Sequence, residues 1–178
     1  MAVPGIDVFL REHMAAFLAD AGYVKDKRVY RAKDADGNTL LVDFDVARFA
    51  PHSVVAFVVR AGIHIPVPRP WLSAELQAEV ASKRIGIEDA QYSVTLLPPV
   101  EYGLEAVSGS PGRGAWVLPP GAEGASAVAS ALRDGLEEHV LPVLLRARAG
   151  ERDSDSFRDP ALTVSTACKP FSWPAVWN

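Results

Sequence analysis

The fold is decided by residues 39–65, which read TLLVDFDVARFAPHSVVAFVVRAGIHI. Within residues 39–49 and 54–65, alternate positions form an apolar row, and the charged or titratable side chains Asp43, Asp45, Arg60 and His64 stand on the other positions. The short segment 50–53 separates the two runs. Alternation with a period of two is typical of a strand with one buried face, and a short polar break between two such runs predicts a hairpin. We therefore expect two antiparallel strands, each with one apolar face.

The register of this hairpin places charged side chains on the opposite face. A slip of one residue would turn the apolar face of one strand to solvent, so the apolar faces must coincide. Asp43 then lies opposite or diagonal to Arg60, and Asp45 and His64 share their face. We call these four residues the polar-face group. The apolar face carries Leu40, Val42, Phe44, Val46, Val55, Phe57, Val59, Ala61 and Ile63.

The segments before the hairpin predict a helix and a strand. Apolar residues at helical spacing predict an amphipathic helix over residues 7–21, with Asp7 as its N-cap and Gly22 as a left-handed C-terminal cap. The alternation in residues 23–31 predicts one strand, and the polar segment 34–38 predicts the turn that joins it to the hairpin.

The segments after the hairpin predict further short strands and a closing helix. Prolines within residues 66–70 end the strand, and Ser73 is expected to cap a short helix. Short apolar runs predict strands over residues 92–97, 102–107 and 115–118. A helix is expected from residue 125 to about 148, and Pro142 should kink or split it near Glu138 or His139, because proline lacks an N–H group.

These elements predict an α+β fold, a mainly antiparallel twisted sheet with the N-terminal and C-terminal helices packed on one face. A chain of 178 residues suits one domain. We assign residues 1–149 to a single α+β domain and residues 150–178 to a polar hinge and an aromatic C-terminal tail.

Composition excludes several classes of partner. Lysine and arginine number 18 against 22 acidic residues, so no basic surface for nucleic acid is expected. No run approaches the roughly 20 apolar residues that span a bilayer, and residues 1–5 do not resemble a secretion signal. The lone Cys168 allows neither an intramolecular disulfide nor a cysteine-based metal site. We expect a soluble cytoplasmic protein.

Six short segments carry a resemblance to a known family. They are LADAGY at 18–23, RVYR at 28–31, LLVDFDV at 40–46, FVVRAGI at 57–63, Trp116 and VLPVL at 140–144. Their order resembles a bacterial family, domain-of-unknown-function family four-three-zero-four, over roughly residues 7–148. The resemblance implies a fold of helices on a meandering sheet, and it implies no activity, because the family is uncharacterised.

The polar-face group has two interpretations. In the first, it forms a pocket for a small polar ligand, where Arg60 clamps an anion and His64 acts as acid or base. In the second, it is a solvated sheet face with an ordinary cross-strand ion pair, worth ~0.5 kcal/mol. The residues alone leave both open.

Other candidate motifs lack the spacing that their chemistry needs. His13, His52, His64 and His139 show no metal-binding pattern, and the glycine-rich segment 109–114 lacks the GK[ST] ending of a phosphate-binding loop. No metal, cofactor or catalytic residue is therefore predicted. Cys168 is interpreted as a small hydrophobic residue or an inert thiol.

The aromatic end of the chain must be covered by something, because exposed aromatic clusters favour association. Phe171, Trp173 and Trp177 are predicted to form a lid over the polar sheet face or to dock on a protein partner or a second copy of the chain.

The sequence favours a non-catalytic binding or protein-interaction module of a soluble bacterial protein. The alternative is a small-molecule binder or small enzyme that uses Asp43, Asp45, Arg60 and His64.

Overall fold

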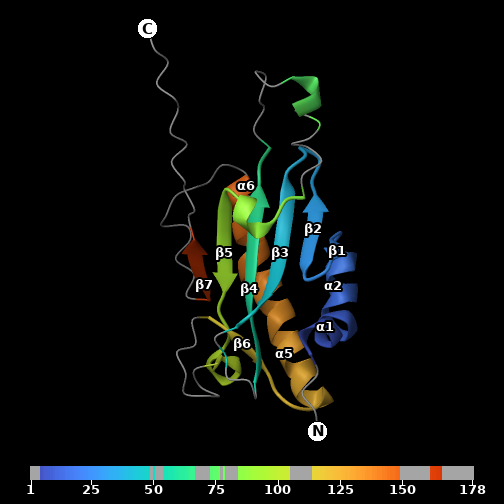
Figure 1. Cartoon of the computed structure of the whole chain (residues 1–178). Coiled ribbons are helices and arrows are strands. Elements are labelled where there is room, and N and C mark those ends of the chain that lie inside the picture. The colour runs from blue at the N-terminus through green and yellow to red at the C-terminus, as the bar shows by residue number, and fades with distance from the viewer. Residues whose placement is uncertain are drawn as a thin grey trace.

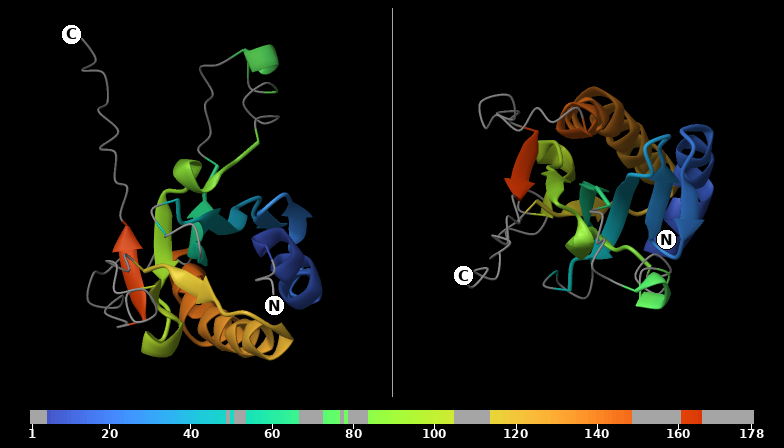
Figure 2. Two further views of the ribbon diagram at one scale, coloured as in Figure 1. Left: turned by 60° about the horizontal axis from the view of Figure 1, so that its bottom comes forward. Right: turned by 90° about the horizontal axis from the view of Figure 1, so that it is seen from above.

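The computed structural model describes residues 5–48, 50, 54–66, 73–76, 78, 84–104, 114–148 and 161–165. They form the expected α+β fold, in which the N-terminal and C-terminal helices pack on one face of a twisted antiparallel sheet (Figure 1). Seen from above, the long C-terminal helix runs along one side of the sheet, and the N-terminal helix lies at the β1–β2 end of the sheet, residues 24–33 (Figure 2).

The sheet has the strand order β1-β2-β3-β4-β5-β7, and β6 pairs with β4 beside β5. Every neighbouring pair is antiparallel. The strands are β1 (Val24–Asp26), β2 (Val29–Lys33), β3 (Thr39–Val46), β4 (Val55–His64), β5 (Tyr92–Leu96), β6 (Trp116–Leu118) and β7 (Leu162–Ser165).

The register predicted for the central hairpin is confirmed. Asp43 of β3 pairs directly with Arg60 of β4, and Phe44 pairs with Val59 on the apolar face. Phe44 and Val59 are fully buried beneath the helices. Trp116 of β6 also belongs to this core, and its indole N–H donates to the carbonyl oxygen of Leu96 at 2.9 Å, which ties the end of β5 to the start of β6.

Both helices contain a π-helical turn. The N-terminal helix consists of α1 (Ile6–Phe9), η1 (Leu10–Met14) and α2 (Ala15–Asp20), and the C-terminal helix consists of α5 (Ala122–Gly135), η4 (Leu136–Val140) and α6 (Leu141–Arg148). The η4 turn confirms the interruption expected from Pro142. Leu141 donates its N–H to the carbonyl of Leu136, five residues back, immediately before the proline that has no N–H to donate.

The π-helical turn η1 is the point at which the N-terminal helix contacts the C-terminal helix. Arg133 of α5 donates a hydrogen bond to the backbone carbonyl of His13 in η1. The same guanidinium lies 5.9 Å from the ring centre of Phe17. This contact fixes the N-terminal helix against the C-terminal one over the apolar face of the sheet.

One predicted helix cap is confirmed and one is wrong. Gly22 has φ +85°, its N–H donates to Ala19, and the next N–H donates to Leu18, so the first helix ends as expected. The N-cap of the first helix is Gly5 and not Asp7 as predicted, and the Gly5 carbonyl accepts the N–H of Phe9. Asp7 lies inside the first turn, and its carboxylate is taken up by an arginine described below.

Two predicted strands differ from the structure, and one further predicted helix cap is confirmed. Residues 23–31 do not form one strand, because Lys27 adopts φ +57° and turns the chain between β1 and β2. Residues 100–102 form the short 3₁₀ helix η3 (Val100–Tyr102) rather than the start of a strand, while residues 105–107 lie outside the described residues. Ser73 caps as predicted, accepting the N–H of Leu76 at 3.3 Å.

The region assigned to the hinge and tail contributes to the sheet. Leu162 of β7 pairs with Leu96 of β5, and the N–H of Leu97 donates to the carbonyl of Ala161 at 2.8 Å. Residues 162–165 thus form an edge strand of the same sheet. Cys168, Phe171, Trp173 and Trp177 lie outside the described residues.

In the part of the chain that the structure describes, no helix is long and apolar enough to cross a membrane.

The core generates a pH-dependent prediction for Tyr23. Its hydroxyl is buried and has no hydrogen-bond partner in the described structure, and burial raises the pKa of Tyr23 to about 12. Above pH 10 the unfolded chain releases this proton while the folded chain keeps it, so Tyr23 lowers stability as pH rises toward 12. We expect the free energy of unfolding of Tyr23→Phe, measured by urea titration, to fall less steeply between pH 9 and pH 11 than that of wild type; equal slopes would contradict this.

Candidate functional site

Three of the four residues of the polar-face group meet in an ion-pair cluster, Asp43, Asp45 and Arg60. The Nη2 atom of Arg60 lies 2.6 Å from Oδ2 of Asp43 and 3.2 Å from Oδ2 of Asp45. The Asp43 side chain is 10% exposed, that of Arg60 37% and that of Asp45 56%. The cross-strand ion pair that the register predicts is therefore present, and one of its carboxylates is buried.

Burial is the dominant influence on Asp43. It raises the pKa of the Asp43 carboxyl above its usual range even though Arg60 acts in the opposite direction, and the nearby charges of Asp45 and Glu88 raise the pKa further. The Nε atom of Arg60 is buried and has no hydrogen-bond partner in the described structure. The cluster thus places two carboxylates on one nitrogen of the Arg60 guanidinium.

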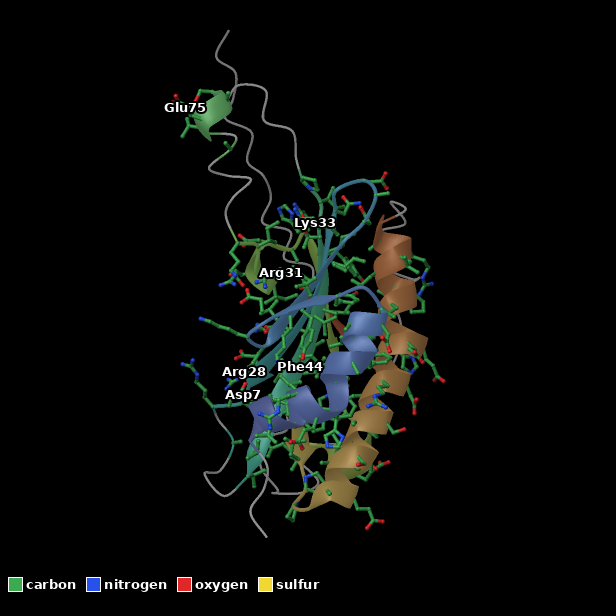
Figure 3. The ribbon with its side chains drawn as sticks, turned by 90° about the vertical axis from the view of Figure 1, so that its right-hand side faces the viewer. Asp7, Arg28, Arg31, Lys33, Phe44 and Glu75 are labelled. Atoms are coloured by element: carbon green, nitrogen blue, oxygen red, sulfur yellow. The ribbon has the colours of Figure 1, made fainter. Side chains whose placement is uncertain are left out.

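The ion-pair cluster continues as a row of alternating charges toward the first helix. Arg28, in the turn between β1 and β2, donates from Nε and Nη2 to the two carboxylate oxygens of Asp7 at 2.8 and 2.7 Å (Figure 3). The hydrogen bond with Asp7 raises the pKa of Arg28, and the charge of Asp45 adds to that effect. The row therefore runs Asp7, Arg28, Asp45, Arg60, Asp43 and links the first helix to the strands.

The polar sheet face is covered beside the cluster. A Cβ atom at Gly62 would lie 2.9 Å from the Cβ atom of Ala90 and 2.9 Å from the carbonyl oxygen of Tyr92. The covering segment contains the short helix η2 (Ile87–Asp89) and is held by Arg31, whose Nε donates to the carbonyl oxygen of Ile85 at 2.8 Å. This cover is not predicted from the sequence, although a glycine in the middle of a central strand is a signal of close backbone approach.

His64 lies apart from the other three residues of the polar-face group. It pairs with Thr39, four residues along β4 from Arg60, which corresponds to roughly 13 Å along the strand. Gly62 and the covering segment lie between the two positions. The structure therefore does not bring His64 within reach of the cluster, and an acid or base beside Arg60 would have to come from elsewhere.

A second candidate site lies between the middle of the C-terminal helix and the end of β5. It is a depression of about 520 Å³, which we call the α5 depression. Its most buried lining residues, Leu96 and Trp116, are apolar, and we call them its floor. Pro98 and Pro99 form a proline wall, and the exposed carboxylates Asp134 and Glu138 form an acidic rim. The lining residues are Leu96, Leu97, Pro98, Pro99, Trp116, Ala131, Asp134, Gly135, Glu138, His139 and Ala161.

Two of the helix residues that line this depression, Ala131 and Gly135, are small. A Cβ atom at Gly135 would lie 3.0 Å from Leu96 Cδ2, so the helix approaches β5 closely here, and the π-helical turn η4 begins at the next residue. Ala131 and Gly135 alternate with Asp134 and Glu138 on one helix face. That pattern was visible in the sequence, but the partner surface, made by Pro98, Pro99 and Ala161, was not.

The remaining candidates carry no site in the described part of the chain. His52 and most of the glycine-rich segment 109–114 lie outside it, as do Phe171, Trp173 and Trp177. Among the described residues, no group of three or more histidine, cysteine, aspartate or glutamate side chains could hold a metal ion.

Comparison of the chain with protein-family models, with curated proteins and with solved structures finds no match. The resemblance to domain-of-unknown-function family four-three-zero-four therefore stays a prediction.

The cover over Gly62 can be tested by adding one methyl group. We expect Gly62→Ala to lower the free energy of unfolding by about 1–3 kcal/mol, because the new Cβ atom overlaps side-chain atoms of Ile87 and Ala90 in the covering segment and the carbonyl oxygen of Tyr92 in β5. Gly103→Ala is the matched control, since its nearest atom would lie 3.5 Å away, and it should change stability by less than about 0.5 kcal/mol. Equal effects in urea titrations would show that the segment does not pack on Gly62.

The ion-pair cluster generates a prediction with a defined pH dependence. Arg60→Met leaves the buried Asp43 carboxylate without its cation, and we expect a loss of about 1–3 kcal/mol at pH 7, the partial exposure of Arg60 reducing the cost of a fully buried pair. The raised pKa of Asp43 means that acidification protonates it in the folded state, so the loss should shrink from pH 7 toward pH 4. A loss that is constant over this range would contradict the assignment.

Proposed function

We propose that the protein is a non-catalytic binding module of a soluble bacterial protein and that its contact surface is the α5 depression. The observation that supports this is a depression of about 520 Å³ with an apolar floor and a charged rim. Ligand sites have this volume range and combine apolar walls with a few polar groups that fix orientation.

The arrangement of the polar-face group supports binding over catalysis. Arg60 shares Nη2 between two carboxylates, so an anion bound at Arg60 would lie beside two negative charges. His64 lies too far along β4 to exchange a proton with a ligand held at Arg60.

A second candidate function remains, a small-molecule binder or small enzyme at the ion-pair cluster. It is favoured by the raised pKa of Asp43, because carboxyl groups with shifted pKa values gather at functional sites. The net negative charge of the cluster suits a cationic ligand better than the anion expected from the sequence.

Location and partners beyond the described residues are also proposals. A cytoplasmic location is supported by the single cysteine. A protein partner or a second copy of the chain, bound through Phe171, Trp173 and Trp177, is supported by the aromatic content of the tail.

The two candidate sites can be separated by variants of the full chain used as bait with extract of the native organism. Ala131→Leu fills the α5 depression without changing charge, and Asp45→Asn/His64→Gln alters the polar face while leaving the buried pair intact. We expect a retained partner to be depleted at least tenfold by Ala131→Leu and to remain with the polar-face variant. Melting temperatures of both variants serve as the folding control.

The opposite pattern, loss with Asp45→Asn/His64→Gln and retention with Ala131→Leu, would support the ion-pair cluster as the site. Retention of every bound component by both variants would overturn the α5 depression as the contact surface.

A further inference from the structure

We propose that the α5 depression accepts a lysine or arginine side chain from an extended basic segment of a partner protein. This inference rests on the proposed function and names the chemistry of the partner at that site.

The charge of the rim points to a cation. Asp134 and Glu138 lie one helical turn apart, and both line the depression. Neither carboxylate pairs with a cation among the described residues, whereas Asp7, Asp26 and Asp43 each have an arginine. The described lining residues, which also include His139, contain no lysine or arginine. The rim therefore presents two exposed negative charges to an incoming group.

The floor fits the rest of such a side chain. Leu96, Leu97, Pro98 and Trp116 provide apolar surface beneath the acidic rim. Lysine and arginine lay an aliphatic stem along apolar surface while their charged end stays near water. In the α5 depression the stem would cover the prolines and leucines, and the charged end would reach Asp134 and Glu138 at the rim. A purely apolar or an anionic group would satisfy only one half of this surface.

The exposure of the surroundings favours a protein over an engulfed small molecule. Pro99, Asp134 and Glu138 are all exposed, so the mouth is wide, whereas small-molecule sites bury 70–90% or more of their ligand. Val100, next to the proline wall, is 81% exposed. A partner that inserts one side chain would also cover Val100 with its own surface, which gives an apolar contact beside a charged one.

The test uses the full-length ¹⁵N-labelled protein and a capped tri-lysine peptide as the probe. We expect the peptide to shift the amide resonances of Leu96, Leu97, Val100 and residues 131–139 in a saturable way. The same peptide with acetylated lysines, which keeps the stems and loses the charge, should bind at least tenfold more weakly. Binding should also weaken as salt is raised.

Matched variants separate the depression from general attraction to an acidic protein. Asp134→Asn/Glu138→Gln should raise the Kd for tri-lysine at least tenfold. Glu123→Gln/Glu137→Gln removes the same charge from exposed positions of the same helix that do not line the depression, and it should keep the wild-type Kd within about twofold. Ala131→Leu, which keeps all charges and fills the space, should weaken binding as the rim variant does.

The proposal is overturned if the two double variants weaken binding equally, if the acetylated peptide binds as tightly, or if the shifts map to other residues. Its failure is distinguishable from failure of the proposed function. If Ala131→Leu releases a cellular partner but tri-lysine does not bind the depression, the contact surface stands and the basic side chain is wrong.

Discussion

The pairing of β4 on both of its edges is the constraint on which the rest of the structure depends. Along one edge it pairs with β3, and along the other it pairs with β5 over its second half and with β6 over its first. Phe57, Val59, Ala61 and Ile63 on its apolar face are at most 1% exposed. A slip of one residue would bring Arg60 and His64 into the core and expose this row, so burial fixes the register.

That register also explains the polar face. Because Arg60 must lie opposite Asp43, the guanidinium is held between two carboxylates before any ligand arrives. Because Gly62 lies two residues further on, the segment around η2 can approach the sheet without overlap. The α5 depression has a different origin. It forms where small residues of α5 and the start of η4 lie against Pro98 and Pro99 after β5. Among the described residues, its carboxylates Asp134 and Glu138 form no ion pair that stabilises the fold.

The features that follow from periodicity could be predicted from the sequence. Alternation predicts the hairpin register, helical spacing predicts both helices, and Pro142 predicts the interruption at η4. The features that depend on contacts distant in sequence could not. Lys27 carries a turn that usually calls for glycine or asparagine, and β7 follows a polar segment that reads as a hinge. The cover over Gly62 and the α5 depression need residues from separate segments, so only parts of them show in the pattern.

Native-state hydrogen exchange tests the central role of β4 most directly. The hydrogen-bonded amides of β4 from Phe57 to Ile63 should open only with global unfolding, with the same free energy as urea titration gives, while those of the short edge strand β1 should exchange much faster. Exchange of the β4 amides through local opening, at a free energy well below the global value, would contradict the account.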